Sequence, residues 1–262
     1  MTFFKKTMQA LVAVAAVTTL AMPAHAQSAL DRILSAKKIT IAVQNDVPPY
    51  SQIGSDNQVE GMDIDIAKAI AKDLGVELDM VVVTGANLVP TLVTNKADLV
   101  IATVGINPQR AATIALSNPY TSYPMVMIAS KSTDMKDFAA TEGKVIGVTR
   151  GTMQDDIVTR FATNAEVRRY DDDATVIQAL ATNQIDATVF GTSVAADLAK
   201  RFPNLELEPK FDAFSVYAGV AMRRADADLL QWVNTWIFFN EKSGFLGEMH
   251  KKWLNIELPA LN

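Results

Sequence analysis

Short apolar runs rich in β-branched residues alternate along the chain with stretches in which apolar residues recur every three or four positions. Runs of the first kind lie at 37–46 (KKITIAVQND), 99–104 (LVIATV), 143–152 (GKVIGVTRGT) and 187–190 (ATVF). Such runs are typical of buried strands, and the three-to-four spacing is typical of amphipathic helices. Strands that alternate with helices form parallel sheets, so the pattern predicts an α/β fold.

The clearest helical pattern is GMDIDIAKAIAKDLG at 61–75. We expect Asp63 to be its N-cap and Gly75 the glycine that ends it. Asp63 and Asp65 could also be read as a catalytic pair of carboxylates, but capping and the helix dipole already explain aspartates in a first turn. The expected apolar face holds Ile66, Ala67, Ile70, Ala71 and Leu74, and the expected polar face holds Lys68, Lys72 and Asp73.

A short motif, L-x-T-N-x-x-D, occurs twice, at 92–98 (LVTNKAD) and at 180–186 (LATNQID). Each copy ends a helix-like stretch and leads into an apolar run. The strand-like segments at 37–46 and 143–152 also resemble each other. Chance is the alternative for so short a match, but we prefer two similar α/β units.

The tail at 227–253 is predicted to be helical, interrupted at SGFLG, with an apolar stripe that faces the core: Leu230, Trp232, Val233, Trp236 and Ile237. We therefore predict a first lobe at 27–124, a second lobe at 125–215, and a return of 216–262 to the first lobe. Two connections between lobes favour a hinge over a loose tether.

The first 26 residues have the features of a cleavable secretory signal peptide. Two lysines precede an apolar stretch that is too short to span a bilayer, and the triplet Ala24-His25-Ala26 fits the cleavage pattern. We expect the mature protein to begin at Gln27 and to reside in the periplasm. No cysteine follows that could carry a lipid anchor.

The mature chain carries 22 basic and 29 acidic side chains, a net charge of −7. Such a charge disfavours nucleic acid and anionic lipid as partners. With no cysteine the protein has no disulfides, so its core alone must stabilise it. We expect no membrane insertion and a monomer.

Catalytic and metal-binding motifs are scarce. His250 is the only histidine of the mature chain and lies among lysines in an expected surface helix, and neither a phosphate loop nor a dinucleotide fingerprint is present. We expect no cofactor and no metal. Polar residues gather instead where predicted strands end, the edge at which open α/β sheets bind ligands. They form four clusters: Val47-Pro48-Pro49-Tyr50; Thr103, Gly105 and Arg110; Gly151-Thr152-Met153; and Phe190-Gly191-Thr192-Ser193.

The sequence resembles the extracytoplasmic solute-binding proteins of polar amino acid ABC importers over nearly the whole mature chain. The matching segments are GMDIDIAKAIAKDLG, PPY, VTNKADLVIATVGINPQRA, SNPY, VIGVTRGT and IDATVFGTSVAADL. The resemblance implies a two-lobe hinged fold, each lobe a mixed sheet flanked by helices, a small amino acid-like ligand and a membrane permease as partner. It implies that Arg110 binds the ligand carboxylate, with further donors from Thr103, Gly105, Gly151 and Thr152.

The sequence departs from that family at three positions. Members commonly have an aspartate for the ligand ammonium where this chain has Gly191, a second aromatic where it has Val47, and a threonine where it has Met153. Without that aspartate we expect acidic ligands to be preferred over basic ones, unless Asp46 or Asp212 restores the charge.

Three questions of function stay open at the level of sequence. Arg150 could contact an acidic ligand or lie outside the site. An enzyme on the same fold, similar to cyclohexadienyl dehydratase, is one alternative function. A ligand-sensing periplasmic protein is the other.

Overall fold

The computed structural model describes residues 28–261, so the predicted signal peptide lies outside the described residues. The α-helices are α1 Ala29–Ala36, α2 Met62–Leu74, α3 Leu88–Val93, α4 Pro108–Ala111, α5 Met153–Phe161, α6 Asp173–Ala181, α7 Thr192–Arg201, α8 Ala227–Lys242 and α9 Phe245–Leu254. The strands are β1 Lys38–Val43, β2 Gln52–Ile53, β3 Val59–Glu60, β4 Glu77–Val82, β5 Leu99–Gly105, β6 Ile114–Ser130, β7 Val145–Thr149, β8 Glu166–Tyr170, β9 Ala187–Gly191 and β10 Leu207–Arg223. The described residues also contain three 3₁₀ turns: η1 Gly85–Asn87, η2 Ala139–Thr141 and η3 Pro203–Leu205.

Eight strands form one sheet in the order β4-β1-β5-β10-β6-β9-β7-β8. Strand β1 pairs in parallel with β4 and β5, and β7 pairs in parallel with β8 and β9. Strands β6 and β10 are antiparallel to each other, and each contains 17 residues. The sheet is therefore mixed, with two parallel units joined by one long antiparallel pair.

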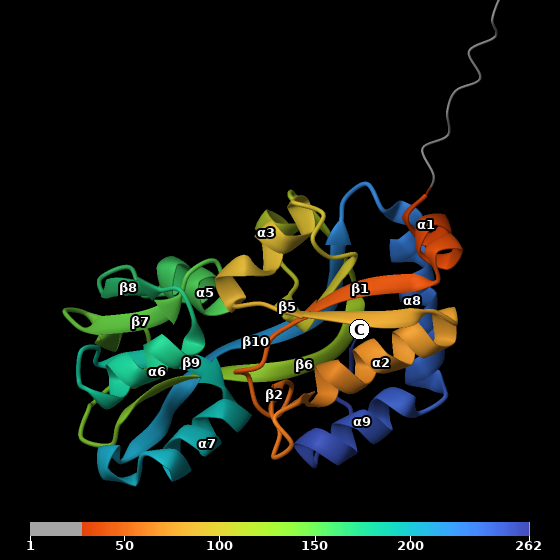
Figure 1. Ribbon diagram of the computed structural model, residues 1–262. Helices are drawn as coiled ribbons and strands as arrows, with labels where there is room; N and C mark the ends of the chain where they lie inside the picture. Colours follow the sequence, from red (N-terminus) through yellow and green to blue (C-terminus); the bar gives the residue numbers. More distant parts are fainter. Residues whose placement is uncertain (1–27, 262) are drawn as a thin grey trace, which may run out of the picture.

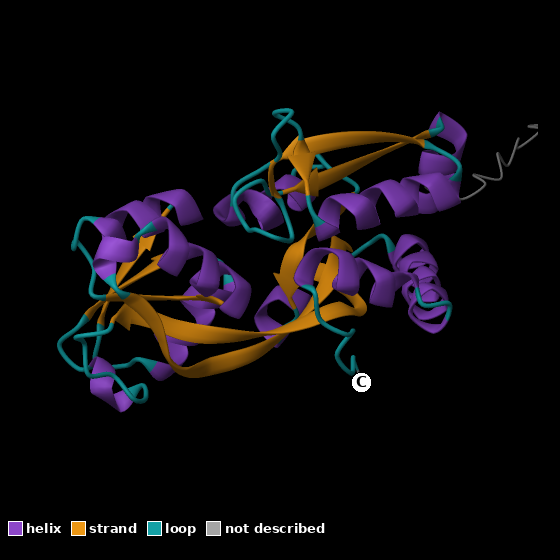
Figure 2. Cartoon of the chain, turned by 90° about the horizontal axis from the view of Figure 1, so that it is seen from below, coloured by secondary structure: helices purple, strands orange, loops and turns teal. Residues whose placement is uncertain are grey.

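The long pair divides the molecule into two lobes (Figure 1). Lobe 1 contains β1, β4 and β5 with α1–α4, α8 and α9, and lobe 2 contains β7–β9 with α5–α7. Strand β10 pairs with β5 at Ala218–Ala221, whereas β6 pairs with β9 at Met125–Ala129. Figure 2 shows the two strands running from one group of helices to the other. The two-lobe α/β fold expected from the sequence is confirmed.

Each lobe has a core on both faces of its sheet. In lobe 1 the side chains of Ile39, Ile41 and Val43 pack on the face covered by α2, α8 and α9, while Ala42 points to the face covered by α3. Lobe 2 likewise has one core under α5 and another under α6 and α7. Because both faces are covered, its central strands read as continuous apolar runs.

The repeated motif is the same structural turn in both lobes. Asn95 and Asn183, just after α3 and α6, both adopt φ 56°, in the left-handed region that asparagine tolerates. Their backbone N–H groups donate to the carbonyls of Leu92 and Leu180, near the ends of those helices. Three residues later, the carboxylates of Asp98 and Asp186 accept a backbone N–H from β1 and from β7, respectively. Two similar α/β units therefore explain the repeat, and chance does not.

Two sequence predictions were wrong. The N-cap of α2 is Gly61, at φ 138°, where a Cβ atom would lie 2.2 Å from the carbonyl oxygen of Tyr50; Asp63 is instead fully buried in the first turn. His250 is also fully buried, because it lies one helical turn after Leu246 on the inner face of α9 while its lysine neighbours point outward. Gly75 does end α2, at φ 67°.

Candidate functional site

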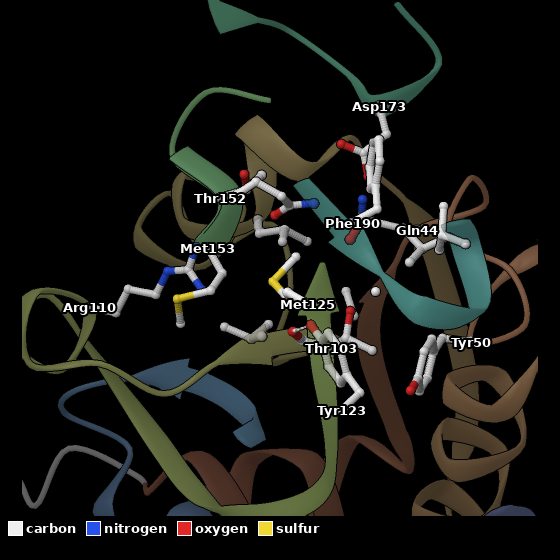
Figure 3. A pocket seen from close by; sticks show the side chains of 17 residues that line it. Gln44, Tyr50, Thr103, Arg110, Tyr123, Met125, Thr152, Met153, Asp173 and Phe190 are labelled. Carbon is white, nitrogen blue, oxygen red and sulfur yellow. Dashed lines mark hydrogen bonds between the residues drawn. The ribbon is translucent and has the colours of Figure 1, made fainter. Parts of the chain in front are cut away.

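A small pocket lies between the lobes, at the edge where β1, β5, β7 and β9 end (Figure 3). Its cavity measures about 40 Å³, room for only two or three water molecules at roughly 15 Å³ each. Both lobes contribute side chains. Seven of the expected site residues line it: Tyr50, Thr103, Arg110, Thr152, Met153, Phe190 and Gly191.

Four expected residues do not line this pocket. Gly105 and Gly151 are absent from the lining, but their carbonyl groups accept hydrogen bonds from the guanidinium of Arg110. Thr192 is exposed at the first position of α7. Arg150 points away, with a side chain that is 61% exposed and an ion pair to Asp171 at 3.3 Å. Of its two readings, the structure favours a position outside the site.

Arg110 links the lobes. Its Nη1 donates to the carbonyl of Gly105 at 3.0 Å in lobe 1, and its Nη2 donates to the carbonyl of Gly151 at 2.9 Å in lobe 2. The backbone N–H of Arg110 is capped by the side chain of Asn107, which starts α4. The residue is only 9% exposed, and this burial lowers the pKa of its guanidinium. A buried cation with neutral partners favours an anion nearby.

A chain of hydrogen bonds holds Thr103 in place. Thr103 is a non-glycine residue at φ 45°, and its backbone N–H donates to the hydroxyl of Tyr120 at 3.1 Å. That hydroxyl donates to Asp63 Oδ1 at 2.7 Å. Burial raises the pKa of Asp63 to about 7. Asp63 therefore supports the pocket residue Thr103 through Tyr120. It does not form a carboxylate pair with Asp65, which instead binds Lys252 and Trp253.

The aromatic wall of the pocket comes from Tyr50, in the loop after β1, and Tyr123, in strand β6. The carbonyls of Pro49 and Tyr50 accept the amides of Met62 and Asp63 at the start of α2, which fixes the Pro-Pro-Tyr loop. Tyr50 is 3% exposed, and its ring centroid lies 5.4 Å from that of Tyr123. Tyr123 was missed because SNPYTSY offers two tyrosines and the alternation of β6 decides which one faces the pocket.

The Gly151-Thr152 turn differs in detail from the expected anion cradle. The N–H of Gly151 donates to Asp155 Oδ2 at 3.0 Å, and the N–H of Thr152 donates to the carbonyl of Thr149. Thr152 is the N-cap of α5, so the amides at the first two helical positions belong to Met153 and Gln154. Those amides have no partner within the helix, and both residues line the pocket.

The sequence analysis also missed Asp173. It is the first residue of α6, only 4% exposed, and it lines the pocket together with Gln44 of lobe 1. The hydroxyl of Thr149 donates to Asp173 Oδ1, and burial raises the pKa of its carboxyl group to about 7. In the sequence it is the last of three consecutive aspartates at the start of a helix. Helix capping explains such a run, so the run carries no separate sign of a pocket residue.

Asp173 changes the expected charge of the site. The preference for acidic ligands assumed that the pocket lacks a carboxylate, and that premise was wrong. Asp46, offered as a substitute, does not line the pocket, but it lies close enough to Asp173 to raise the pKa of that carboxyl group. Asp212 is exposed on β10 and does not line the pocket.

Within residues 28–261 no helix has the length and apolar character needed to cross a bilayer. The same residues contain no group of three or more histidine, cysteine or acidic side chains placed to hold a metal ion.

Two α/β lobes joined by a long strand pair, with a small charged pocket between them, define the class of two-lobe solute-binding proteins. Residues 39–256 match the model of the bacterial extracellular solute-binding proteins, family 3, and the chain belongs to that family.

Three similar proteins illustrate the relationship. The L-cystine-binding protein TcyJ of Escherichia coli (strain K12) is 29% identical over 258 residues, which cover 97% of each chain. A mutant of ArgBP from T. maritima superposes with a TM-score of 0.80 at 29% identity, covering 87% of this chain and 100% of that one. The ancestral amino acid-binding protein AncCDT-1, described as a precursor of cyclohexadienyl dehydratase, gives a TM-score of 0.77 at 30% identity and covers 86% of this chain and 99% of that one.

Proposed function

We propose that the protein is the periplasmic substrate-binding component of an ABC importer and captures an amino acid or a related small carboxylate between its lobes. The observation that carries the proposal is Arg110, a buried guanidinium in the interlobe pocket with hydrogen bonds to one carbonyl from each lobe. A guanidinium fork matches a carboxylate in a bidentate manner, and its hydrogen bonds to an anion are stronger than those to neutral carbonyls.

Capture requires the lobes to move. A cavity of about 40 Å³ is too small for an amino acid, so the ligand enters when the lobes separate. The carboxylate then replaces the carbonyls of Gly105 and Gly151 on Arg110, and contacts from both lobes shift the population toward the closed form. We place the boundaries of the lobes at 27–124, 125–215 and 216–262, with the hinge in β6 and β10.

The relatives support the other parts of the proposal. TcyJ is named for binding L-cystine, and a mutant of ArgBP is described as arginine-bound, so an amino acid is the expected cargo and a membrane permease the expected partner. Cleavage after residue 26, residence in the periplasm and a monomeric state belong to the same proposal.

The proposal is that the protein binds its ligand without converting it. AncCDT-1 makes this point worth testing, because it is an amino acid-binding protein that preceded an enzyme. Mass spectrometry of each stabilising amino acid after incubation tests this point. Recovery of the unchanged compound agrees with a binding protein, and conversion to a product of lower mass would show a dehydratase-like activity.

The binding function itself is tested by a thermal-shift panel of the twenty L-amino acids and L-cystine, followed by calorimetry of the compounds that stabilise. We expect one compound, or a few of related chemistry, to raise the midpoint of unfolding and to bind with a stoichiometry of one. A panel without any stabilising compound would contradict amino acid capture.

A further inference from the structure

From the charges that line the pocket, we infer that Asp173 is the counter-charge for an ammonium group of the ligand, so that the site selects zwitterionic amino acids over simple carboxylates. This inference rests on the proposed function. Among the described residues that line the pocket, Arg110 is the only cation and Asp173 the only anion. One basic and one acidic side chain match the two charged groups of a zwitterion.

The two charges are separated across the pocket. Arg110 comes from α4 of lobe 1 and Asp173 from the first turn of α6 in lobe 2. Figure 3 shows them on opposite sides, with Phe190 and Gln44 near the aspartate and Met153 near the arginine. They are not paired with each other in an ion bridge. Each charge can therefore serve a different end of one ligand.

Among the described residues, two of the buried aspartates, Asp63 and Asp173, have no cation to balance them, and of these two only Asp173 lines the pocket. Asp155, also in lobe 2, forms an ion pair with Arg169 at 2.9 Å, and Asp98 in lobe 1 pairs with Arg32. Asp173 has the Thr149 hydroxyl as its hydrogen-bond partner, and its charged neighbours Asp46 and Asp172 are of the same sign. A carboxylate buried in this way is costly unless it gains a cation, which a ligand ammonium supplies.

Closure adds a second carboxylate to this position. Asp46 follows β1 in lobe 1, its Oδ1 accepts a hydrogen bond from Gln44 Nε2 at 3.3 Å, and its charge raises the pKa of the Asp173 carboxyl group. The closed form therefore brings like charges from opposite lobes together. An ammonium group between them would turn this repulsion into attraction, so that zwitterions favour the closed form more than simple carboxylates do.

The experiment compares matched ligands in matched variants. The amino acid of the panel that stabilises the wild type most is titrated by calorimetry beside its analogue with hydrogen in place of the α-amino group. In the wild type we expect the analogue to bind about 30-fold more weakly or worse, the loss that follows removal of one partner of a buried charge pair. In Asp173→Asn we expect this difference to fall below about threefold, because the amide leaves no charge for the ammonium to meet.

Asp172→Asn is the matched control. It removes the same charge one residue earlier, and asparagine is as good an N-cap as aspartate, so α6 keeps its cap on Thr175. This control should discriminate between the two ligands as the wild type does. Unfolding midpoints without ligand establish that each variant is folded.

The possible outcomes distinguish a failure of the Asp173 inference from a failure of the proposed function. Full discrimination retained by Asp173→Asn would overturn the inference and leave amino acid binding intact. Discrimination lost equally in Asp172→Asn would also overturn it, since a general change in potential would then explain the effect. A wild type that no panel member stabilises would overturn the proposed function and this inference together.

A double variant tests whether the charge can act from another position. Gly191 lines the same pocket, its φ of −61° suits any residue, and an added Cβ would lie 3.4 Å from Tyr123, an ordinary contact. We expect Gly191→Asp in the Asp173→Asn background to restore part of the preference for the ammonium-bearing ligand. Discrimination that is unchanged both in Asp173→Asn and in the folded double variant would place ammonium recognition elsewhere.

Discussion

The two lobes share one plan and differ in what they bring to the pocket. Each places its middle strand between two parallel neighbours, and each repeats the Asn turn and the Asp–backbone bond that close its helix onto the sheet. Lobe 1 adds a short capped helix after β5 and with it the cation Arg110. Lobe 2 adds the anion Asp173 after β8. The scaffold is therefore duplicated, and the chemistry lies in the connections that follow the strands.

Removal of the lobe 1 charge should have the largest effect on binding. We expect Arg110→Ala to weaken amino acid binding by about 2–5 kcal/mol, the usual loss for one partner of a buried charge pair. Arg110→Lys should recover only part of this, because an ammonium cannot reproduce the fork. Calorimetry measures both. A loss below about 1 kcal/mol for the alanine variant would place Arg110 outside the binding site.

Two buried groups, His250 in lobe 1 and Asp173 in lobe 2, should respond to pH in opposite directions. Burial lowers the pKa of His250 in lobe 1 to about 4, so its neutral form is stabilising above its unfolded value near 6.5 and that stability is lost as pH falls toward 4. Burial raises the pKa of Asp173 to about 7, so stability is lost as pH rises from about 4 to 7. At about 1.4 kcal/mol per pKa unit, we expect each group to contribute about 3–4 kcal/mol over its window.

Two variants separate these contributions in unfolding experiments without ligand. His250→Leu should lose less stability than the wild type between pH 7 and pH 4.5. Asp173→Asn should be more stable than the wild type at pH 8, with the advantage gone near pH 4. Parallel pH profiles for all three proteins would show that neither group titrates on unfolding.

Breaking the hydrogen-bond chain that supports Thr103 in lobe 1 should have a smaller effect on stability and binding. Tyr120→Phe leaves the buried carboxylate of Asp63 without its donor and should cost about 1–3 kcal/mol in the free energy of unfolding, with weaker ligand binding. Tyr123→Phe is the control, since that hydroxyl makes one longer bond of 3.4 Å to the Thr103 carbonyl. Denaturant titration in which the two variants are equally stable would remove Tyr120 from its supporting role.

The smallest effect tests the duplication itself. Asn95→Ala and Asn183→Ala place alanine at φ 56° and should each cost about 1 kcal/mol, while glycine at either position should be nearly neutral. Equal losses in urea unfolding would support equivalent turns. A loss at one position only would show that the repeated motif has different roles in the two lobes.

The fold was more accessible from the sequence than the pocket was. Helical spacing identified the buried face of α2, and the position of Arg110 after an apolar strand indicated a ligand group. The pocket position of Asp173 and the burial of His250 were missed because of the residues beside them. Asp173 ends a run of aspartates typical of helix capping, and His250 precedes two lysines typical of an exposed helix face. Which face such a residue presents depends on packing between elements, and local pattern does not encode it.

Native mass spectrometry of protein freshly purified from periplasmic extracts tests the central claim most directly, that one amino acid is held between the lobes by Arg110. We expect the wild type to carry one added mass equal to that of an amino acid, and Arg110→Ala, purified in the same way, to carry none. An added mass retained in Arg110→Ala would contradict the assigned site. A wild type that neither carries an amino acid nor gains one when the panel is added would contradict the account as a whole.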